Sequence, residues 1–262
     1  MQSSEMAGAT SGSAARRRTA VVTGGASGMG ADTCRVLAGR GYRVAVADVD
    51  GDGAHRVAEE LRASGAESVG VAVDVTDRVL VDDAFAKVRS ELGPIEVLVT
   101  SAGLVAFDKF SEITAQSWTK VIDVNLNGTF HCCQAVIDDM VAGGWGRIVT
   151  ISSSSAQRGS PGMAHYAASK GAVIALTKSL AREYARSGIT VNTIPPSGIE
   201  TPMQHQSQAM GNLPSNEVMV KAIPVGHLGS GYDIASTAAF LCSEEAGYIT
   251  GQVVGVNGGS VI

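Results

Sequence analysis

The 262-residue chain is poor in features that would each point to a particular class of protein. Its four cysteines have no spacing typical of a metal site, so we expect buried, reduced thiols and no metal. The net charge of −5 provides no general attraction to nucleic acid. No run approaches the roughly 18 apolar residues that a membrane-spanning helix needs. We therefore expect no nucleic-acid or membrane partner, and a small molecule as the ligand.

The N-terminal residues also lack an apolar stretch of the length that a signal peptide requires. Residues 1–18 are rich in serine, alanine and glycine and end in three arginines. This composition predicts a disordered tail whose arginines are a solvated lead-in, followed by one domain over residues 19–262. We expect a cytoplasmic protein.

What the chain does have is 45% hydrophobic residues and 32 glycines. Short apolar runs alternate with helix-like segments, which favours parallel strands buried on both faces, with helices on each side. The fold class predicted is α/β, a doubly wound Rossmann-type fold with about seven parallel strands. The expected strands cover residues 20–23, 44–47, 69–73, 95–100, 147–152, 189–194 and 252–256.

A glycine-rich turn follows the first of these runs. The sequence from Gly24 to Gly30 reads Gly-Gly-Ala-Ser-Gly-Met-Gly, and a helical pattern comes after it. Glycines let the backbone approach a pyrophosphate closely, and a helix N-terminus supplies amide donors. The turn therefore predicts a dinucleotide site.

An acidic residue, Asp48, ends the second apolar run. A carboxylate at this place can accept hydrogen bonds from both ribose hydroxyls and would repel a 2′-phosphate. No lysine or arginine lies among residues 24–30 to offset that repulsion. NAD is therefore predicted in preference to NADP.

Tyr166 and Lys170 are four residues apart, and Ser153 is thirteen residues before Tyr166. On a helix, positions i and i+4 share a face, so the Lys170 ammonium should lie beside the phenol and lower its pKa. Together with the Ser153 hydroxyl, these groups suit the interconversion of an alcohol and a ketone. His165 should point away from this helix face.

These motifs resemble the short-chain dehydrogenases/reductases over nearly the whole chain, from about Thr19 to Gly259. The resemblance implies a catalytic tetrad of Asn125, Ser153, Tyr166 and Lys170, with Asn125 positioning a water that connects Lys170 to solvent. It also implies cofactor contacts from Gly24, Ser27, Gly28, Met29, Gly30, Asp48, Asp74, Val75, Ala102, Gly103, Tyr166, Lys170, Pro196, Ile199 and Thr201.

The chain departs from the family pattern in two places. Thr100-Ser101 stands where two asparagines are usual, which puts their side-chain hydrogen bonds in doubt. Ser197 stands where a glycine is usual, so either Ser197 is strained or Gly198 takes the conformation that glycine allows.

The segment 200–223 contains Met203, Met210 and Met219 among polar residues. Flexible thioethers adapt to varied apolar ligands, so we expect a lid over an apolar ketone or acyl chain. Val105 is expected in the pocket wall. The predicted substrate contacts are Ser153, Ser155, Gln157, Tyr166, Ser197 and Met203.

The sequence therefore predicts an NAD-dependent enzyme that interconverts a secondary alcohol and a ketone, with Tyr166 as general acid/base and a hydrophobic or cyclic alcohol as substrate. The alternatives are a 3-oxoacyl-thioester reductase or 3-hydroxyacyl-CoA dehydrogenase, and a noncatalytic dinucleotide-binding sensor. Two predicted helices, around Asn125–Met140 and Tyr166–Arg186, are apolar on more than one face, and the resemblance implies a homotetramer packed through them.

Overall fold

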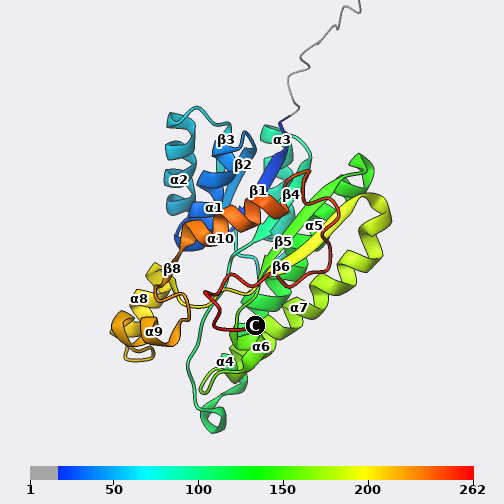
Figure 1. Ribbon diagram of the computed structural model, residues 1–262. Helices are drawn as coiled ribbons and strands as arrows, with labels where there is room; N and C mark the ends of the chain where they lie inside the picture. Colours follow the sequence, from blue (N-terminus) through cyan, green and yellow to red (C-terminus); the bar gives the residue numbers. More distant parts are fainter. Residues whose placement is uncertain (1–16) are drawn as a thin grey trace, which may run out of the picture.

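The computed structural model describes residues 17–262 and places a six-stranded parallel sheet at the centre of the chain (Figure 1). The strand order β3-β2-β1-β4-β5-β6 is that of a doubly wound fold. The strands are β1 (Thr19–Thr23), β2 (Arg43–Asp48), β3 (Ser68–Ala72), β4 (Ile95–Thr100), β5 (Gly146–Ile151) and β6 (Ile189–Ile194).

Helices cover both faces of the sheet, as the unbroken apolar strands require. The strands contribute residues to two separate cores; in β1, for example, Val21 faces one core and Val22 the other. One face is covered by α1 (Gly28–Gly39), α2 (Gly51–Ala63) and α10 (Gly231–Leu241), and the other by α3 (Arg78–Leu92), α5 (Gly128–Gly143) and α7 (Ala164–Tyr184).

The expected seventh strand, residues 252–256, is not a strand in the structure. It runs beside β6 but pairs with it only through isolated bridges, Thr193 to Val253 and Pro196 to Val256. The physical reason is the Pro195-Pro196 pair, which offers no amide hydrogen to continue the ladder. The prediction of about seven strands is corrected to six.

Shorter elements connect the strands and long helices, most of them after the carboxyl ends of the strands, whereas η3 (Ala185–Ser187) directly precedes β6. The others are η1 (Phe110–Glu112), α4 (Ala115–Ile122), the π-helical turn η2 (Asp123–Asn127), α6 (Ser155–Arg158), β7 (Ile199–Glu200), α8 (Pro202–Ala209), α9 (Asn216–Ala222) and β8 (Gly229–Ser230). Figure 1 shows α8 and α9, in yellow to orange, standing apart from the sheet. The segment 200–223, predicted to be a lid, contains these two short helices.

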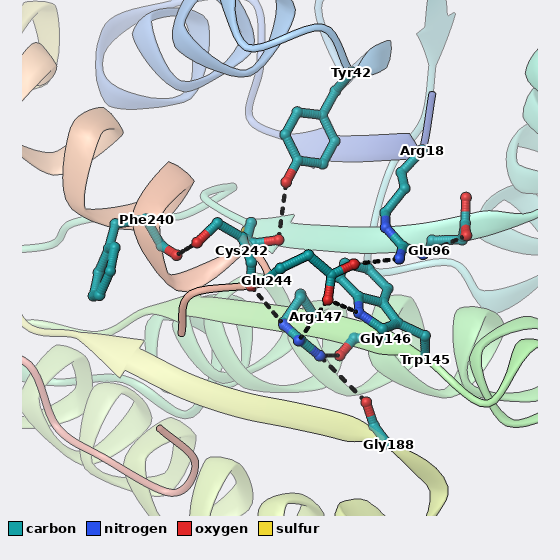
Figure 2. A network of polar contacts seen from close by, with 11 residues as sticks. Arg18, Tyr42, Glu96, Trp145, Gly146, Arg147, Gly188, Phe240, Cys242 and Glu244 are labelled. Atoms are coloured by element: carbon teal, nitrogen blue, oxygen red, sulfur yellow. Dashed lines mark hydrogen bonds and ion pairs between the residues drawn. The ribbon is translucent and has the colours of Figure 1, made fainter. Parts of the chain in front are cut away.

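A polar cluster closes the opposite end of the sheet, where the strands begin (Figure 2). Arg18 donates to Glu96 over 2.9 Å and also to Glu244, and its guanidinium carbon lies 3.5 Å from the centre of the Trp145 ring. Arg147, only 3% exposed, donates to the carbonyl oxygens of neighbouring loops and pairs with Glu244 at 3.9 Å. Arg18 is therefore held in ion pairs and is not the solvated residue that the sequence predicts; residues 1–16 of the predicted tail lie outside the described part.

Several general features concern the whole described range. All four cysteines are free and buried, as predicted. Between residues 17 and 262, no helix has the length and apolarity to cross a membrane, and no group of three or more metal-ligating side chains comes together.

Candidate active site

The glycine turn joins β1 to α1 in a conformation that only glycine permits at two of its positions. Gly24 has a φ of +68°, and a Cβ built there would lie 2.6 Å from the amide nitrogen of Ala102. A Cβ on Gly30 would lie 2.0 Å from the carbonyl oxygen of Gly24. These close approaches pack the first turn of α1 against the turn and against the end of β4.

Beyond the turn lies a cavity of about 950 Å³ at the carboxyl ends of β1, β2 and β4. This is where ligands bind in a doubly wound sheet, because the strand order reverses between β1 and β4. The predicted cofactor residues that line it are Gly24, Ser27, Gly28, Met29, Gly30, Asp48, Asp74, Val75, Ala102, Gly103 and Thr201. A glycine cradle beside a cavity of this size fits a bound dinucleotide.

Asp48, at the end of β2, lines this cavity. Its two carboxylate oxygens accept hydrogen bonds from the backbone amides of Ala26 and Asp50, each over 3.0 Å. The same cavity is lined by Lys120, an exposed cation on α4 that the sequence analysis did not consider. Asp48 and Lys120 therefore bring charges of opposite sign to this cavity, and both bear on the choice between NAD and NADP.

Lys170 lies on α7 and reaches the end of β5. Its Nζ donates a hydrogen bond to the carbonyl oxygen of Ile151 over 2.9 Å, and the residue is only 4% exposed. Burial lowers the pKa of the ammonium from 10.5 to about 8. A cation that can lose its proton near neutral pH suits a proton-transfer site.

Tyr166 stands one turn before Lys170, as the i, i+4 spacing predicts, and the Lys170 Nζ is 6.0 Å from the centre of its ring. The predicted lowering of the phenol pKa is wrong for this structure. Burial raises the pKa of Tyr166, and a hydrogen bond with Ser153 only partly offsets it, because the phenolate loses more hydration than its neighbours restore. The phenol is therefore protonated at neutral pH.

Ser153 follows β5 and is held by its own neighbour. The Ser155 hydroxyl donates to the Ser153 Oγ over 2.8 Å, and the Ser155 amide approaches the same oxygen at 3.2 Å. The hydrogen bond between Ser153 and Tyr166 places both hydroxyls around one point. Ser155 thus orients Ser153, a role different from the predicted substrate contact.

Asn125 lies in the π-helical turn η2 and is completely buried. Its Oδ1 accepts from the Leu104 amide over 2.8 Å, while its Nδ2 donates to the Leu104 carbonyl over 2.9 Å and to the Ser169 Oγ over 3.0 Å. The side chain thus ties the segment after β4 to α7. Such π-helical turns are often found at functional sites.

The loop after β6 resolves the question of Ser197. Gly198 takes the left-handed conformation, with a φ of +62°, and among the described residues no side-chain-bearing residue has a positive φ. Of the predicted contacts in this loop, Thr201 lines the large cavity and caps α8, whereas Pro196 and Ile199 do not line it. The Pro196 carbonyl instead accepts from the Ser154 amide over 3.0 Å.

A second cavity, of about 500 Å³, adjoins the first at Ser27, Pro202 and Met203, which line both. Its other walls are the segment 104–107 and residues of α8 and the turn after it, including Met210. Met203, predicted as a substrate contact, and Val105, predicted in the pocket wall, both line this second cavity. None of the other predicted substrate contacts lines either cavity, and neither does Lys170; these contacts are Ser153, Ser155, Gln157, Tyr166 and Ser197. Gln157 is exposed on α6.

Sequence reasoning missed part of this site. Four polar residues of α4 and the turn after it line the large cavity, and Ser169 completes the hydrogen bonds of Asn125. The cavity-lining set is Gln116, Thr119, Lys120 and Asp123. Their i, i+3, i+4, i+7 spacing is a visible signal, but a polar helix face usually indicates solvent exposure.

Comparisons with known proteins agree with this geometry. A family model described as enoyl-(acyl carrier protein) reductase matches residues 24–260. A 3-oxoacyl-(acyl-carrier-protein) reductase FabG of Staphylococcus epidermidis is 39% identical over 243 residues, which are 92% of this chain and 98% of the relative. An acetoacetyl-CoA reductase of Rhizobium meliloti is also 39% identical, again over 92% of this chain and 98% of the relative. The crystal structure of gox2181 superimposes with a TM-score of 0.88 at 35% identity and covers 93% of this chain and 95% of that one.

Proposed function

The chain belongs to the short-chain dehydrogenase/reductase family, and from this premise we propose that it reduces 3-oxoacyl thioesters to 3-hydroxyacyl thioesters. Enzymes of this family are oxidoreductases that bind a nicotinamide dinucleotide. The single observation that carries the proposal is the convergence of Ser153, Tyr166 and Lys170, whose Nζ lies close to Gly103 on the wall of a dinucleotide-sized cavity.

The protonation state of Tyr166 supports the reductive direction. Reduction of a carbonyl needs a proton donor at the oxygen, and a phenol whose pKa is raised by burial keeps its proton at neutral pH. A bound reduced nicotinamide supplies the hydride for the carbonyl carbon. Tyr166 donates its phenolic proton to the substrate oxygen, and the Ser153 hydroxyl donates a hydrogen bond to the same oxygen.

Lys170 stabilises the phenolate that this transfer leaves behind. Its ammonium is buried within 6.0 Å of the phenol ring, where the low dielectric strengthens the attraction between the two charges. Asn125 acts through its contacts with Leu104 and Ser169, and so positions the neighbouring segment and α7. In the reverse reaction the same phenolate accepts the hydroxyl proton.

The sequence predicts a hydrophobic or cyclic alcohol as the substrate, with a thioester as an alternative. The names of the relatives favour the thioester. Both curated relatives described above are named as reductases of 3-oxoacyl groups carried on a thioester. The second cavity offers apolar side chains from Leu104 to Phe107 beside the site, which suits an acyl chain. The alcohol dehydrogenase remains the second candidate, since the same tetrad serves either substrate.

The proposed cofactor is NADH. Asp48 presents its carboxylate to the cavity where an adenosine ribose would lie, and a 2′-phosphate there would meet a negative charge. Lys120 lines the same cavity from α4 and is the one cation on its wall among the described residues. Its exposure makes it a weak partner, so the Asp48 charge governs the choice.

The experiment is the consumption of NADH or NADPH with acetoacetyl-CoA and a longer 3-oxoacyl thioester, run beside a panel of cyclic ketones. Turnover of thioesters with NADH supports the proposal in full. Turnover of cyclic ketones alone overturns the substrate, and preference for NADPH overturns the role given to Asp48. Binding of NADH without turnover of any substrate would establish the noncatalytic sensor.

Two further expectations from the sequence belong to this proposal, a homotetramer and a cytoplasmic location. The exposed aromatic side chains of Trp118 on α4 and Phe130 on α5, 41% and 42% exposed, suit an interface between copies. Sedimentation or light scattering of the purified chain gives the mass, and a monomer contradicts the assembly.

A further inference from the structure

The segment that follows β4 forms a wall of the second cavity and has no regular structure of its own. Residues 101–109 contain neither helix nor strand, and the side chains of residues 104–107 line the cavity. Because this segment lacks the backbone hydrogen bonds of a helix or a strand, its position depends on the contacts at its two ends.

The first end is held by the site itself. Asn125 pairs with both the amide and the carbonyl of Leu104. One residue earlier, a Cβ on Gly103 would lie 3.3 Å from the Asn125 Oδ1 and 3.4 Å from the Lys170 Nζ. The wall therefore starts one residue after a glycine that lies close to Lys170.

The second end is held by Asp108, which binds the chain just before Tyr166 in two ways. Its backbone amide donates to the Gly162 carbonyl over 2.8 Å. Its Oδ2 lies 3.0 Å from the Nε2 of His165. A carboxylate can only accept, so the His165 Nε2 carries the proton and donates it to Asp108.

His165 has no other use in this structure. The side chain is 0% exposed, and its Nδ1 is buried with no hydrogen-bond partner among residues 17–262. Buried polar groups normally have a hydrogen-bond partner, and for the His165 imidazole that partner is Asp108. The bond joins the far end of the cavity wall to the residue adjacent to the catalytic tyrosine.

We propose that Asp108 and His165 are positioning residues that set the acyl-chain selectivity of the enzyme by holding the wall 104–107 in place. This inference rests on the proposed function. The reacting carbonyl lies near Ser153 and Tyr166, and only a longer acyl chain extends along Val105 and Phe107 into the second cavity. Loosening the Asp108 end should weaken the binding of long chains and spare short ones.

The test compares a four-carbon with an eight-carbon 3-oxoacyl-CoA in three variants of the exposed end of the segment. Asp108→Ala should raise KM for the long substrate roughly tenfold, with less than about a twofold change for the short one and in kcat. Asp108→Asn retains a carbonyl oxygen that can accept from His165 and should restore the long-chain KM. Lys109→Ala is the matched control, because the Lys109 side chain follows directly in the sequence, is exposed and forms its ion pair with Glu112, at 3.6 Å.

A double-mutant cycle assigns the effect to the pair. Adding His165→Leu to Asp108→Ala should cause no further loss of chain-length selectivity, because one bond is removed by either change. Binding of NADH, followed by its fluorescence, should be unchanged in every Asp108 variant. Equal losses for short and long substrates, or an additive cycle, would overturn the inference.

Failure of the proposed function can be separated from failure of the inference. A wild-type enzyme that turns over no thioester refutes the function. The same variants are then measured with NAD and secondary alcohols of short and long chain, where selectivity must again depend on Asp108. Unchanged chain-length selectivity in Asp108→Ala refutes the inference, whichever substrate class is used. A wild-type chain that turns over neither substrate class also refutes it.

Discussion

The side-chain amide of Asn125 pairs with both backbone groups of Leu104, over 2.8 and 2.9 Å, in the manner of a backbone bridge. A third hydrogen bond, to Ser169, uses the remaining amide proton. Asn125 therefore joins three elements: the turn η2, the segment after β4 and helix α7. Through Ser169, Asn125 reaches the helix that carries Tyr166 and Lys170.

Replacing Asn125 with alanine should destabilise the protein by about 2–4 kcal/mol, because it removes a completely buried side chain that bonds to both the amide and the carbonyl of the partly buried Leu104. Urea unfolding followed by circular dichroism measures the loss. Asn127→Ala is the matched control in the same turn, since Asn127 donates only to the Asp123 carboxylate. Equal losses in the two variants would contradict the role of Asn125.

Replacing Tyr166 with phenylalanine should lower kcat by roughly two or more orders of magnitude, because it removes the proton donor with little change in volume. The affinity for NADH should stay near that of the wild type. Stopped-flow reduction of acetoacetyl-CoA and a fluorescence titration with NADH separate the two effects. Retained turnover would refute the assignment of Tyr166.

The reductive kcat/KM should fall as pH rises through about 8. Below that pH Lys170 is protonated and stabilises the phenolate product of proton transfer; above it the lysine loses its charge, while Tyr166, with a pKa raised above its usual 10.0, keeps its proton. The pH profile of initial rates tests this. In Lys170→Arg the guanidinium stays charged, so the descending limb should move to the more alkaline range of Tyr166. A limb that stays in place would assign it to another group.

Changing Asp48 to asparagine should shift cofactor preference toward NADP. The ratio of kcat/KM for the two cofactors should change by roughly 100-fold, because the variant loses charge-assisted hydrogen bonds to the ribose and the repulsion of a 2′-phosphate. Asp52→Asn, on the first turn of α2 and outside the cavity wall, controls for the loss of one negative charge. Equal shifts of this ratio in both variants would show that the effect comes from the loss of a negative charge and not from the position of Asp48.

Changing Glu244 to glutamine should lower the free energy of unfolding by about 1–2 kcal/mol and leave kcat/KM unchanged. Glu244 pairs with Arg18 and with the buried Arg147 and accepts from the Trp145 indole over 3.0 Å, at the end of the sheet away from the cavity. Glu245→Gln is the control, since this neighbouring carboxylate is exposed and is lowered in pKa first by a hydrogen bond with Ser243. Thermal unfolding and the NADH assay provide both readings.

Local sequence pattern was sufficient for much of the fold and of the site. The six apolar runs up to residue 194 are strands because continuous burial on both faces leaves no other structure open to them. Three features of the site can be recognised in the sequence because each depends only on neighbours within one turn or one loop. They are the glycine turn, Asp48 and the spacing of Tyr166 and Lys170. Residues 252–256 do not form a strand, and the reason lies elsewhere in the chain, because Pro195 and Pro196 have no amide hydrogen to continue the ladder.

What the sequence determined by itself is the order of elements and the identity of the reacting groups, since these follow from periodicity and residue chemistry. Only the tertiary structure decided the environment of those groups. The pKa of Tyr166 is raised because burial outweighs the nearby lysine, and Asn125 is a tie between segments because Leu104 and Ser169 come to it from distant parts of the chain. Desolvation and long-range hydrogen bonds depend on what packs against a residue, and no local pattern contains that information.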